Sequence, residues 1–410
     1  MKKILTVIMA AALALGAVAQ VKPGIEVLRD MDFAPLKGKK VGLLTNPTGV
    51  DNNLKSTVDI LAEAPGVNLV ALYAPEHGVR GNIYAGDTVN NQVDPATGVP
   101  VYSVYGKTRK PTPEMLKDVD VLIYDIQDNG CRSYTFISSM GLAMEACAEE
   151  GKEFMVLDRP NPVGANKIEG CLTEDSCISF VSQFPIPYLY ALTPGELAKY
   201  LDGEGLAGAK GKKLDLTVIP MDGYTRDMDF RSTGMPWVLP SPHIPTPESA
   251  IYYPVTGILG ELYYMSIGVG YTEPFKLFCA KWINADKLAQ RLNARNLPGL
   301  IFRPIYVKPF YSTDKGENIQ GVEVYVTDVD KAPLSLTQFY VMEELADMYP
   351  DHKVFENCDK KRFDMFDKVC GSKEIRRRFA KNYKVADIED YWNKDVDSFR
   401  KASAKYHLYK

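Results

Sequence analysis

The chain has 410 residues, of which 46% are hydrophobic and 24% charged, and its formal net charge is −4 at pH 7. This composition is typical of a soluble globular protein with two or three domains. The small acidic excess argues against nucleic acid or an anionic membrane as the main partner.

Residues 1–19 predict a secretory signal peptide. Lys2 and Lys3 precede an apolar run that ends in the small-residue sequence AVA at 17–19. These are the basic region, hydrophobic region and cleavage site of an exported protein. The run is shorter than the roughly 20 residues that a membrane anchor needs. We therefore expect a mature protein that is periplasmic or extracellular and has no membrane anchor.

Four short apolar runs in the first half of the chain predict strands buried on both faces of a sheet. They are residues 40–44, 68–73, 121–124 and 154–157. Helical spacing between them, as at 136–149, indicates βαβ units. A capping box at Thr193 and Glu196 predicts the start of a later helix. The expected fold class is α/β, with a Rossmann-like, mainly parallel sheet domain over 20–245.

A proline-rich segment at 234–247 predicts the domain boundary. Its sequence, GMPWVLPSPHIPTP, resists regular structure. Beyond it, strand-like and helical segments are mixed without the regular βαβ alternation. We expect a smaller α+β domain over 246–410.

Polar residues follow all four predicted strands. The carboxyl ends of parallel strands lie along one edge of an open sheet, where such sheets bind ligands. The residues brought together in this way are Thr45, Asn46, Glu76, His77, Asp125, Gln127, Asp128, Asp158, Arg159 and Asn161. No G-x-G-x-x-G or Walker sequence accompanies these strands, so a nucleotide site has little support.

Glu76 is the strongest candidate for a catalytic carboxylate. It follows Pro75 on a strand-end loop, with His77 beside it and Gly78 allowing a sharp turn. A carboxyl group in a crevice can act as a general acid; the alternative is a solvated loop glutamate. We expect His77 to donate or accept hydrogen bonds, because no clustered ligand spacing predicts a metal site.

Three further acids are candidates for a second catalytic carboxylate. Asp125 and Asp128 lie three residues apart after the third strand, and Glu169 lies in a later loop. Two carboxylates near one bond are typical of glycosidases, in which their separation sets the stereochemical outcome. The alternative roles are an N-cap, a turn aspartate and a solvated loop acid.

Arginines and aromatic residues offer binding groups. Arg132 and Arg159 can bind an anion or sugar hydroxyls through several donors, or can neutralise acids at the sheet edge. Aromatic faces suit sugar rings, although core packing is the alternative. The aromatic residues after the boundary include Trp237, Tyr252, Tyr253, Tyr263, Tyr264 and Tyr271.

Nine sequence motifs occur together in one order along the chain. They are GLLTNPTG (42–49), APEHGVRG (74–81), VYSVYG (101–106), DVLIYDIQDNGCRSYTF (120–136), LDRPNPVG (157–164), PIP (185–187), TPGELA (193–198), PWVLPSPHIP (236–245) and FDMFDKVCG (363–371). With these motifs the chain resembles, over 21–410, the exo-acting β-N-acetylmuramidase family, long described as a domain of unknown function.

This resemblance implies an active site in a cleft that the smaller domain closes. It also implies release of N-acetylmuramic acid, or a related amino sugar, from the non-reducing end of peptidoglycan fragments, without a cofactor. Glu76 corresponds to the family's strand-end glutamate. The residues expected to bind the sugar are Asn46, His77, Arg80, Gln127, Arg132, Tyr134, Arg159, Asn161, His243 and Glu261.

The segment 260–276 departs from the family pattern E-G-T-N-x-S-x-G-R-G-T followed by P-F-E. Glu261 is kept, but Val269 replaces the arginine, which is an obvious partner for the lactyl carboxylate of muramic acid. The other departures are Tyr263, Tyr264, Lys276 and, earlier in the chain, His243 in place of asparagine.

Without that arginine, the lactyl group would need another cation. The available ones are Arg80, Arg132, Arg159 and Lys276. The substrate is then a modified muramoyl sugar or a different amino sugar. A catalytically inactive saccharide-binding protein is the alternative function, and no feature of the sequence defines the oligomeric state.

Overall fold

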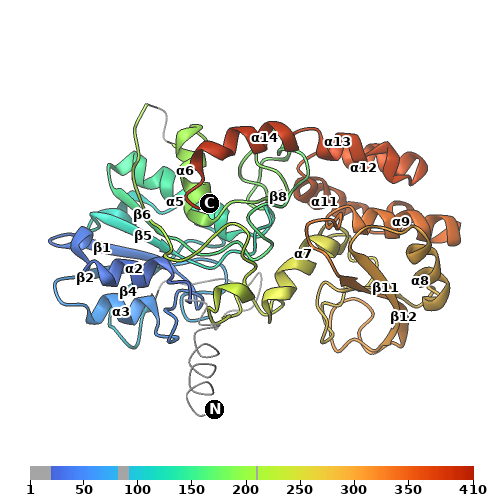
Figure 1. Cartoon of the computed structure of the whole chain (residues 1–410), viewed down its shortest axis with the longest axis horizontal. Helices are drawn as coiled ribbons and strands as arrows, with labels where there is room; N and C mark the ends of the chain where they lie inside the picture. Colours follow the sequence, from blue (N-terminus) through green and yellow to red (C-terminus); the bar gives the residue numbers. More distant parts are fainter. Residues whose placement is uncertain (1–19, 82–91, 209–210) are drawn as a thin grey trace, which may run out of the picture.

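The computed structural model describes residues 20–81, 92–208 and 211–410. The predicted signal peptide, residues 1–19, lies outside the described residues. The described residues form a sheet domain, coloured mainly blue to green, and a second domain beside it, coloured mainly yellow to orange; the red end of the chain lies over the sheet domain (Figure 1).

A seven-stranded sheet forms the centre of the first domain. In spatial order its strands are β3 (Gln92–Val93), β4 (Pro100–Ser103), β2 (Asn68–Ala74), β1 (Lys40–Thr45), β5 (Val121–Asp125), β6 (Glu153–Leu157) and β9 (Asp215–Ile219). Every neighbouring pair is parallel except β3 and β4. The predicted α/β class with a mainly parallel sheet is confirmed.

The chain changes direction across the sheet between β1 and β5. From β1 it runs outward through β2 and β4 on one side, and from β5 through β6 and β9 on the other. In open parallel sheets, the carboxyl ends of the two strands at such a change of direction are where ligands bind. Thr45 pairs with Asp125 in register. Asn46 and the segment 126–129 therefore leave the sheet at the same level.

Helices cover both faces of this sheet because side chains alternate along each strand. They are α2 (Gly24–Asp30) and α3 (Thr57–Glu63) on one face, and α4 (Pro113–Leu116), α5 (Phe136–Glu150) and α6 (Pro194–Gly203) on the other. Val41 and Leu43 of β1 lie in the first core and Leu44 in the second. The capping box that begins α6 is confirmed: Thr193 Oγ1 accepts from the Glu196 amide at 3.2 Å.

The second domain contains a three-stranded antiparallel sheet and a set of helices. The strands are β10 (Leu277–Ala280), β12 (Ile319–Val326) and β11 (Leu300–Val307), in spatial order. The helices are α7 (Pro247–Gly260), α8 (Ala285–Ala294), α9 (Thr337–Met348), α10 (Val354–Asn357), α11 (Phe363–Cys370), α12 (Lys373–Asn382) and α13 (Glu389–Asn393). This agrees with the predicted smaller α+β domain.

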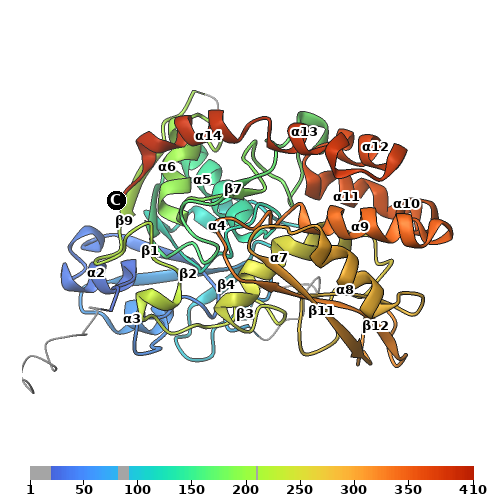
Figure 2. The ribbon, with the colours of Figure 1, turned by 45° about the vertical axis from the view of Figure 1, so that its right-hand side comes forward.

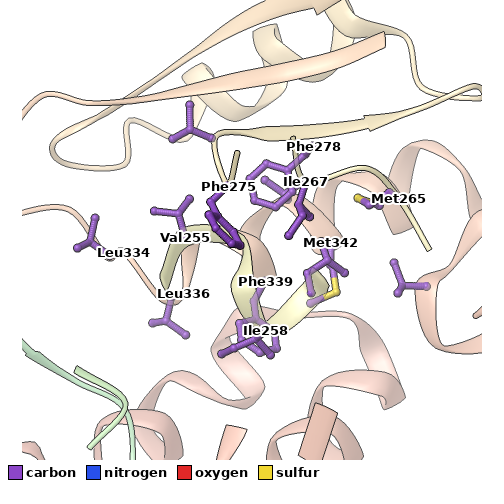
Figure 3. Close-up of a cluster of buried hydrophobic side chains, with 14 of the residues drawn as sticks. Val255, Ile258, Met265, Ile267, Phe275, Phe278, Leu334, Leu336, Phe339 and Met342 are labelled. Atoms are coloured by element: carbon purple, nitrogen blue, oxygen red, sulfur yellow. The ribbon is translucent and has the colours of Figure 1, made fainter. Parts of the chain in front are cut away.

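Helix α7 is fixed to α9 by apolar and polar contacts. Val255 and Ile258 of α7 lie in a buried cluster with Phe339 of α9 (Figure 3). Pro254 interrupts the hydrogen bonding of α7 because it has no amide hydrogen. The Gln338 side chain donates to the Pro254 carbonyl at 3.0 Å and accepts from the Leu259 amide at 2.7 Å.

The end of the chain returns to the first domain (Figure 2). Phe399 of α14 (Val396–Ser403) lies in the core beside α6. The Tyr409 hydroxyl donates to Asp158 at 2.5 Å, and the Leu408 amide donates to Glu196 at 2.9 Å. The last segment of the predicted 246–410 domain thus packs on the sheet domain.

A small two-stranded sheet, β7 (Ile168–Glu169) and β8 (Leu189–Tyr190), lies between the domains' main elements. All seven cysteines are buried and unpaired. Among the described residues, no helix has the length and apolar character needed to span a bilayer.

Candidate active site

Glu76 lies in a tight turn directly after β2. The Gly78 amide donates to the Pro75 carbonyl at 3.0 Å, and His77 has a left-handed backbone with φ of 71°. A non-glycine residue in this conformation costs roughly 1–2 kcal/mol, and such strain clusters at functional sites. The turn places the half-buried Glu76 at the sheet edge.

Two hydroxyl groups donate to the Glu76 carboxylate. Tyr105 Oη lies 2.8 Å from Oε1, and Thr135 Oγ1 lies 2.9 Å from Oε2. Burial raises the pKa of Tyr105, and the Glu76 charge raises it further. Tyr105 therefore keeps its proton at neutral pH and orients the carboxylate.

Asp125 is held in a buried ion pair. Arg159 donates to both of its carboxylate oxygens, at 2.5 and 3.0 Å, and Thr57 Oγ1 donates at 2.6 Å. Arg159 also donates to the Val50 carbonyl at 2.8 Å. Because the polar groups of Asp125 and Arg159 are paired with each other and with other groups of the protein, the geometry gives both residues a structural role.

Asp128 is buried, and only one of its two carboxylate oxygens is hydrogen-bonded to a described residue. Its Oδ2 accepts from the Gly130 amide at 2.8 Å and from the Tyr190 hydroxyl, while Oδ1 has no hydrogen-bond partner among the described residues. Burial raises the pKa of Asp128 to about 6. A carboxyl group that titrates near neutrality, with an open oxygen, is suited to proton transfer.

Glu169 lies in β7 at the contact with the second domain. It accepts from the Leu334 amide at 3.1 Å, the Ser335 amide at 2.8 Å and the Ser335 hydroxyl at 2.6 Å. Lys167 lies 3.1 Å from the same carboxylate. The predicted catalytic role has no geometric support, because these contacts make Glu169 a connection between domains.

Arg132 is buried and donates through all three of its nitrogens. Its acceptors are the Ser182 hydroxyl and the carbonyls of Cys171, Ile186, Val369 and Cys370. These contacts leave no donor for a sugar, so the geometry gives Arg132 a structural role.

Arg80 and Asn161 are also engaged with protein partners. Arg80 pairs with Asp94 at 2.9 Å and with Asp59 at 3.0 Å. Asn161 accepts from the Val163 amide and donates to the Leu192 carbonyl, each at 3.0 Å. Their contacts stabilise the loops around the sheet edge.

Four buried polar atoms without a hydrogen-bond partner among the described residues lie where β1 and β5 end. They are Asn46 Nδ2, Gln127 Oε1, Asp128 Oδ1 and Asn129 Nδ2, which are all buried and have no hydrogen-bond partner among the described residues. Thr48 connects the two strand ends, because its hydroxyl bonds Asn46 Oδ1 and accepts from the Gln127 amide at 2.8 Å. Buried polar atoms are normally paired with protein, water or ligand, so these four atoms make the strand ends a candidate polar site.

A cavity of about 470 Å³ is lined mainly by residues of the second domain. His243 lines it, with Nε2 2.7 Å from the Tyr311 hydroxyl. Burial lowers the pKa of His243, and the nearby His77 lowers it further. The cavity wall and the turn that carries Glu76 are therefore neighbours.

Two tyrosines connect the acids around this cavity. Tyr134 and Tyr253 pack edge to face with ring centroids 5.6 Å apart. Burial raises the pKa of Tyr134, and both Asp128 and Glu76 lie close enough to add to the effect. Burial likewise raises the pKa of Tyr253, with added effects from Glu261 and Glu76.

Glu261 lines the same cavity from the end of α7. Arg362 Nη2 lies 2.8 Å from its Oε2. Burial raises the pKa of Glu261, and Arg362 opposes the shift. Among the described residues, no three His, Cys, Asp or Glu side chains are grouped to hold a metal ion.

The structure thus brings Glu76, His77, Asp128, His243 and Glu261 into one region, together with Tyr134. The roles of Tyr105, Thr135 and Tyr311 were not predicted from the sequence. Tyr105 closely follows β4, so the rule that identified Glu76 also applies to it. Thr135 and Tyr311 have no comparable local signal.

Fold and site together define a class: a two-domain α/β protein with strand-end carboxylates beside a cavity of its second domain. Two family models match the chain. The N-terminal domain of the exo-β-N-acetylmuramidase NamZ matches residues 41–248, and its C-terminal domain matches residues 251–409.

Individual relatives agree with these matches. The peptidoglycan β-N-acetylmuramidase NamZ of Bacillus subtilis (strain 168) is 46% identical over 390 residues, which cover 95% of this chain and 92% of that protein. A crystal structure of a DUF1343 family protein from Bacteroides fragilis NCTC 9343 has 62% identity and a TM-score of 0.92, covering 95% of this chain and 99% of that one. A second such protein from the same organism has 29% identity and a TM-score of 0.71, with coverage of 96% and 99%. The chain therefore belongs to the NamZ exo-β-N-acetylmuramidase family.

Proposed function

We propose that this protein is an exo-acting glycosidase that releases an N-acetylmuramoyl sugar from the non-reducing end of peptidoglycan fragments. One observation carries the proposal: Glu76 is oriented by Tyr105 and Thr135 beside a cavity with aromatic walls. The name of the Bacillus subtilis relative, a peptidoglycan β-N-acetylmuramidase, supports the same substrate class.

Glu76 is the proposed general acid and base. It protonates the glycosidic oxygen as the C1–O bond to the leaving sugar breaks, and it then accepts a proton from the water whose oxygen forms the new bond to C1. Its half-buried position is consistent with access to substrate, and the two hydroxyl donors fix its orientation.

Asp128 is the proposed second carboxylate. Its Oδ1 has no hydrogen-bond partner among the described residues, and both Asp128 and Glu76 lie near Tyr134. These two features favour Asp128 over Asp125 and Glu169. Both of those acids are saturated by protein donors. In this proposal Asn46, His77, Gln127, His243 and Glu261 bind the sugar.

A pair of isomeric disaccharides tests the proposed reaction. An exo-acting enzyme of this kind cleaves N-acetylmuramoyl-N-acetylglucosamine, in which the muramoyl sugar is at the non-reducing end. It does not cleave the reversed disaccharide, N-acetylglucosaminyl-N-acetylmuramic acid. Chromatography of the products measures both. Cleavage of the reversed isomer contradicts the proposal, and binding of both without cleavage favours a saccharide-binding protein.

We also propose that the protein acts outside the cytoplasm. Residues 1–19 have the basic, apolar and small-residue regions of a signal peptide. Peptidoglycan, the proposed source of substrate, lies on that side of the membrane.

A further inference from the structure

The cavity beside Glu76 has no basic wall. Its lining residues are His243, Tyr253, Gly257, Gly260, Glu261, Tyr263, Met265, Ile267, Val269, Phe275, Tyr311, Ser312 and Thr313. Among these described residues there is no lysine and no arginine. Met265, Ile267 and Phe275 belong to the apolar cluster of the second domain (Figure 3).

The ionisable groups of the wall do not supply a positive charge. The pKa of His243 is lowered by burial and by His77, so its imidazole is neutral at neutral pH. Glu261 is acidic, and the guanidinium of Arg362 is engaged with it through Nη2 at 2.8 Å and through Nε, which donates to the Glu261 carbonyl at 2.7 Å. The same guanidinium lies 4.6 Å from the ring centroid of Tyr263.

The four cations predicted to replace the missing arginine are engaged elsewhere. Arg80 pairs with Asp59 and Asp94, Arg159 with Asp125, and Lys276 with Glu273 at 2.7 Å. Arg132 is buried among carbonyl groups. None of the four lines the cavity.

A muramoyl sugar carries a lactyl group whose carboxyl is either free or joined to peptide through an amide. Moving a free carboxylate into a cavity without a cation is unfavourable, and the nearby Glu261 adds like-charge repulsion. An amide is neutral and can use the hydroxyl donors and acceptors of Ser312 and Thr313, which line the cavity. The aromatic surface for an attached peptide is present, since Tyr263 is 62% and Tyr311 39% exposed.

We propose that the cavity selects muramoyl units whose lactyl carboxyl is in amide linkage, as in peptide-bearing fragments, over units with a free lactyl carboxylate. This inference rests on the proposed function above. The cavity volume of about 470 Å³ is within the range that holds ligands larger than a single sugar ring.

Three 4-nitrophenyl β-glycosides test the selection. They carry N-acetylmuramic acid with a free lactyl group, the same sugar with its lactyl group as the methylamide, and N-acetylglucosamine. Nitrophenol release gives kcat/KM for each. We expect kcat/KM for the methylamide to exceed that for the free acid at least tenfold, and to exceed that for N-acetylglucosamine.

V269R adds a guanidinium to the cavity wall, and V269M is the matched control, with a long uncharged side chain. V269R is expected to raise kcat/KM for the free acid severalfold and to lower the methylamide-to-acid ratio. V269M is expected to leave the ratio above ten. An increase in V269M equal to that in V269R would show that side-chain size, not charge, sets the ratio, and would overturn the inference.

The outcomes separate the inference from the proposed function. Faster release from the free acid than from the methylamide overturns the inference alone. Fastest release from N-acetylglucosamine overturns it as well, because that sugar has no lactyl group. Release from none of the three overturns both the inference and the function on which it rests.

Discussion

Asp125 and Asp128 differ in their environments although three residues separate them. Asp125 has an arginine partner that compensates its buried charge. Asp128 has only hydroxyl and amide donors for its Oδ2, and its pKa is raised by burial to about 6. Burial with a counter-ion therefore produces a structural group, and burial without one produces a group that titrates near neutrality.

The raised pKa of Asp128 predicts a specific pH dependence of stability. The ordinary pKa of this group is 3.8, so between about pH 4 and 6 the folded protein binds a proton that the unfolded chain has lost. Its contribution to the free energy of unfolding thus falls as pH rises through this window, by about 3 kcal/mol in total. D128N cannot ionise and should lose this part of the fall, as measured by urea unfolding at several pH values.

The experiment must separate Asp128 from a second buried carboxyl group and needs a control at the surface. Burial also raises the pKa of Asp158 to about 6, so D128N keeps the corresponding fall from Asp158. D118N changes a surface carboxyl group that is 64% exposed and serves as the control. A D128N profile that parallels the wild type from pH 4 to 6 would contradict the assigned pKa.

The strand-end residues could be predicted from the sequence, but their hydrogen-bond and ion-pair partners could not. Glu76, His77 and Asp128 were predicted from their positions after strands, and the structure brings them together. Whether an acid is open or compensated depends on partners far along the chain, as for Asp125 with Arg159. No local pattern contains that information.

At the scale of elements, Arg132 joins the loop after β5 to the end of α11. Its guanidinium donates to the Val369 and Cys370 carbonyls, the last two of that helix. Gly371 follows with φ of 78°, and a Cβ there would lie 2.4 Å from Arg132 Nη2. The helix end therefore requires both a glycine and the arginine.

Replacing Arg132 should destabilise the fold. R132M has a similar length but leaves several buried carbonyl groups without a donor, which is expected to lower the free energy of unfolding by about 3 kcal/mol or more. Urea unfolding measures the change. R303M removes a surface arginine that is 60% exposed, and it should change stability much less than R132M does. Equal losses in the two variants would contradict the structural role of Arg132.

At the scale of the whole molecule, polar contacts hold the two domains beside the site. Glu169 of the first domain accepts from the backbone of Leu334 and Ser335 in the second. Trp392 Nε1 donates to the Ser335 hydroxyl at 2.9 Å and extends the same network. These contacts fix the position of the cavity relative to Glu76.

The domain architecture could be predicted because its signals are local. Apolar runs, helical spacing and the proline-rich segment 234–247 indicated the parallel sheet and the smaller second domain. The return of the chain end to the sheet domain was not predicted, because Tyr409 and Leu408 contact residues more than 200 positions away. Such long-range packing has no periodic signature.

The proposed role of Glu76 in proton transfer can be tested by replacing it with glutamine. The measurement is kcat for release of a chromogenic aglycone from the preferred muramoyl substrate by wild type, E76Q and E114Q. E114Q is the control, since Glu114 is a surface residue with a side chain 77% exposed. We expect kcat of E76Q to fall by a factor of about 10² or more, while E114Q keeps wild-type kcat and both variants stay folded. Turnover by a folded E76Q within a few-fold of wild type would contradict it.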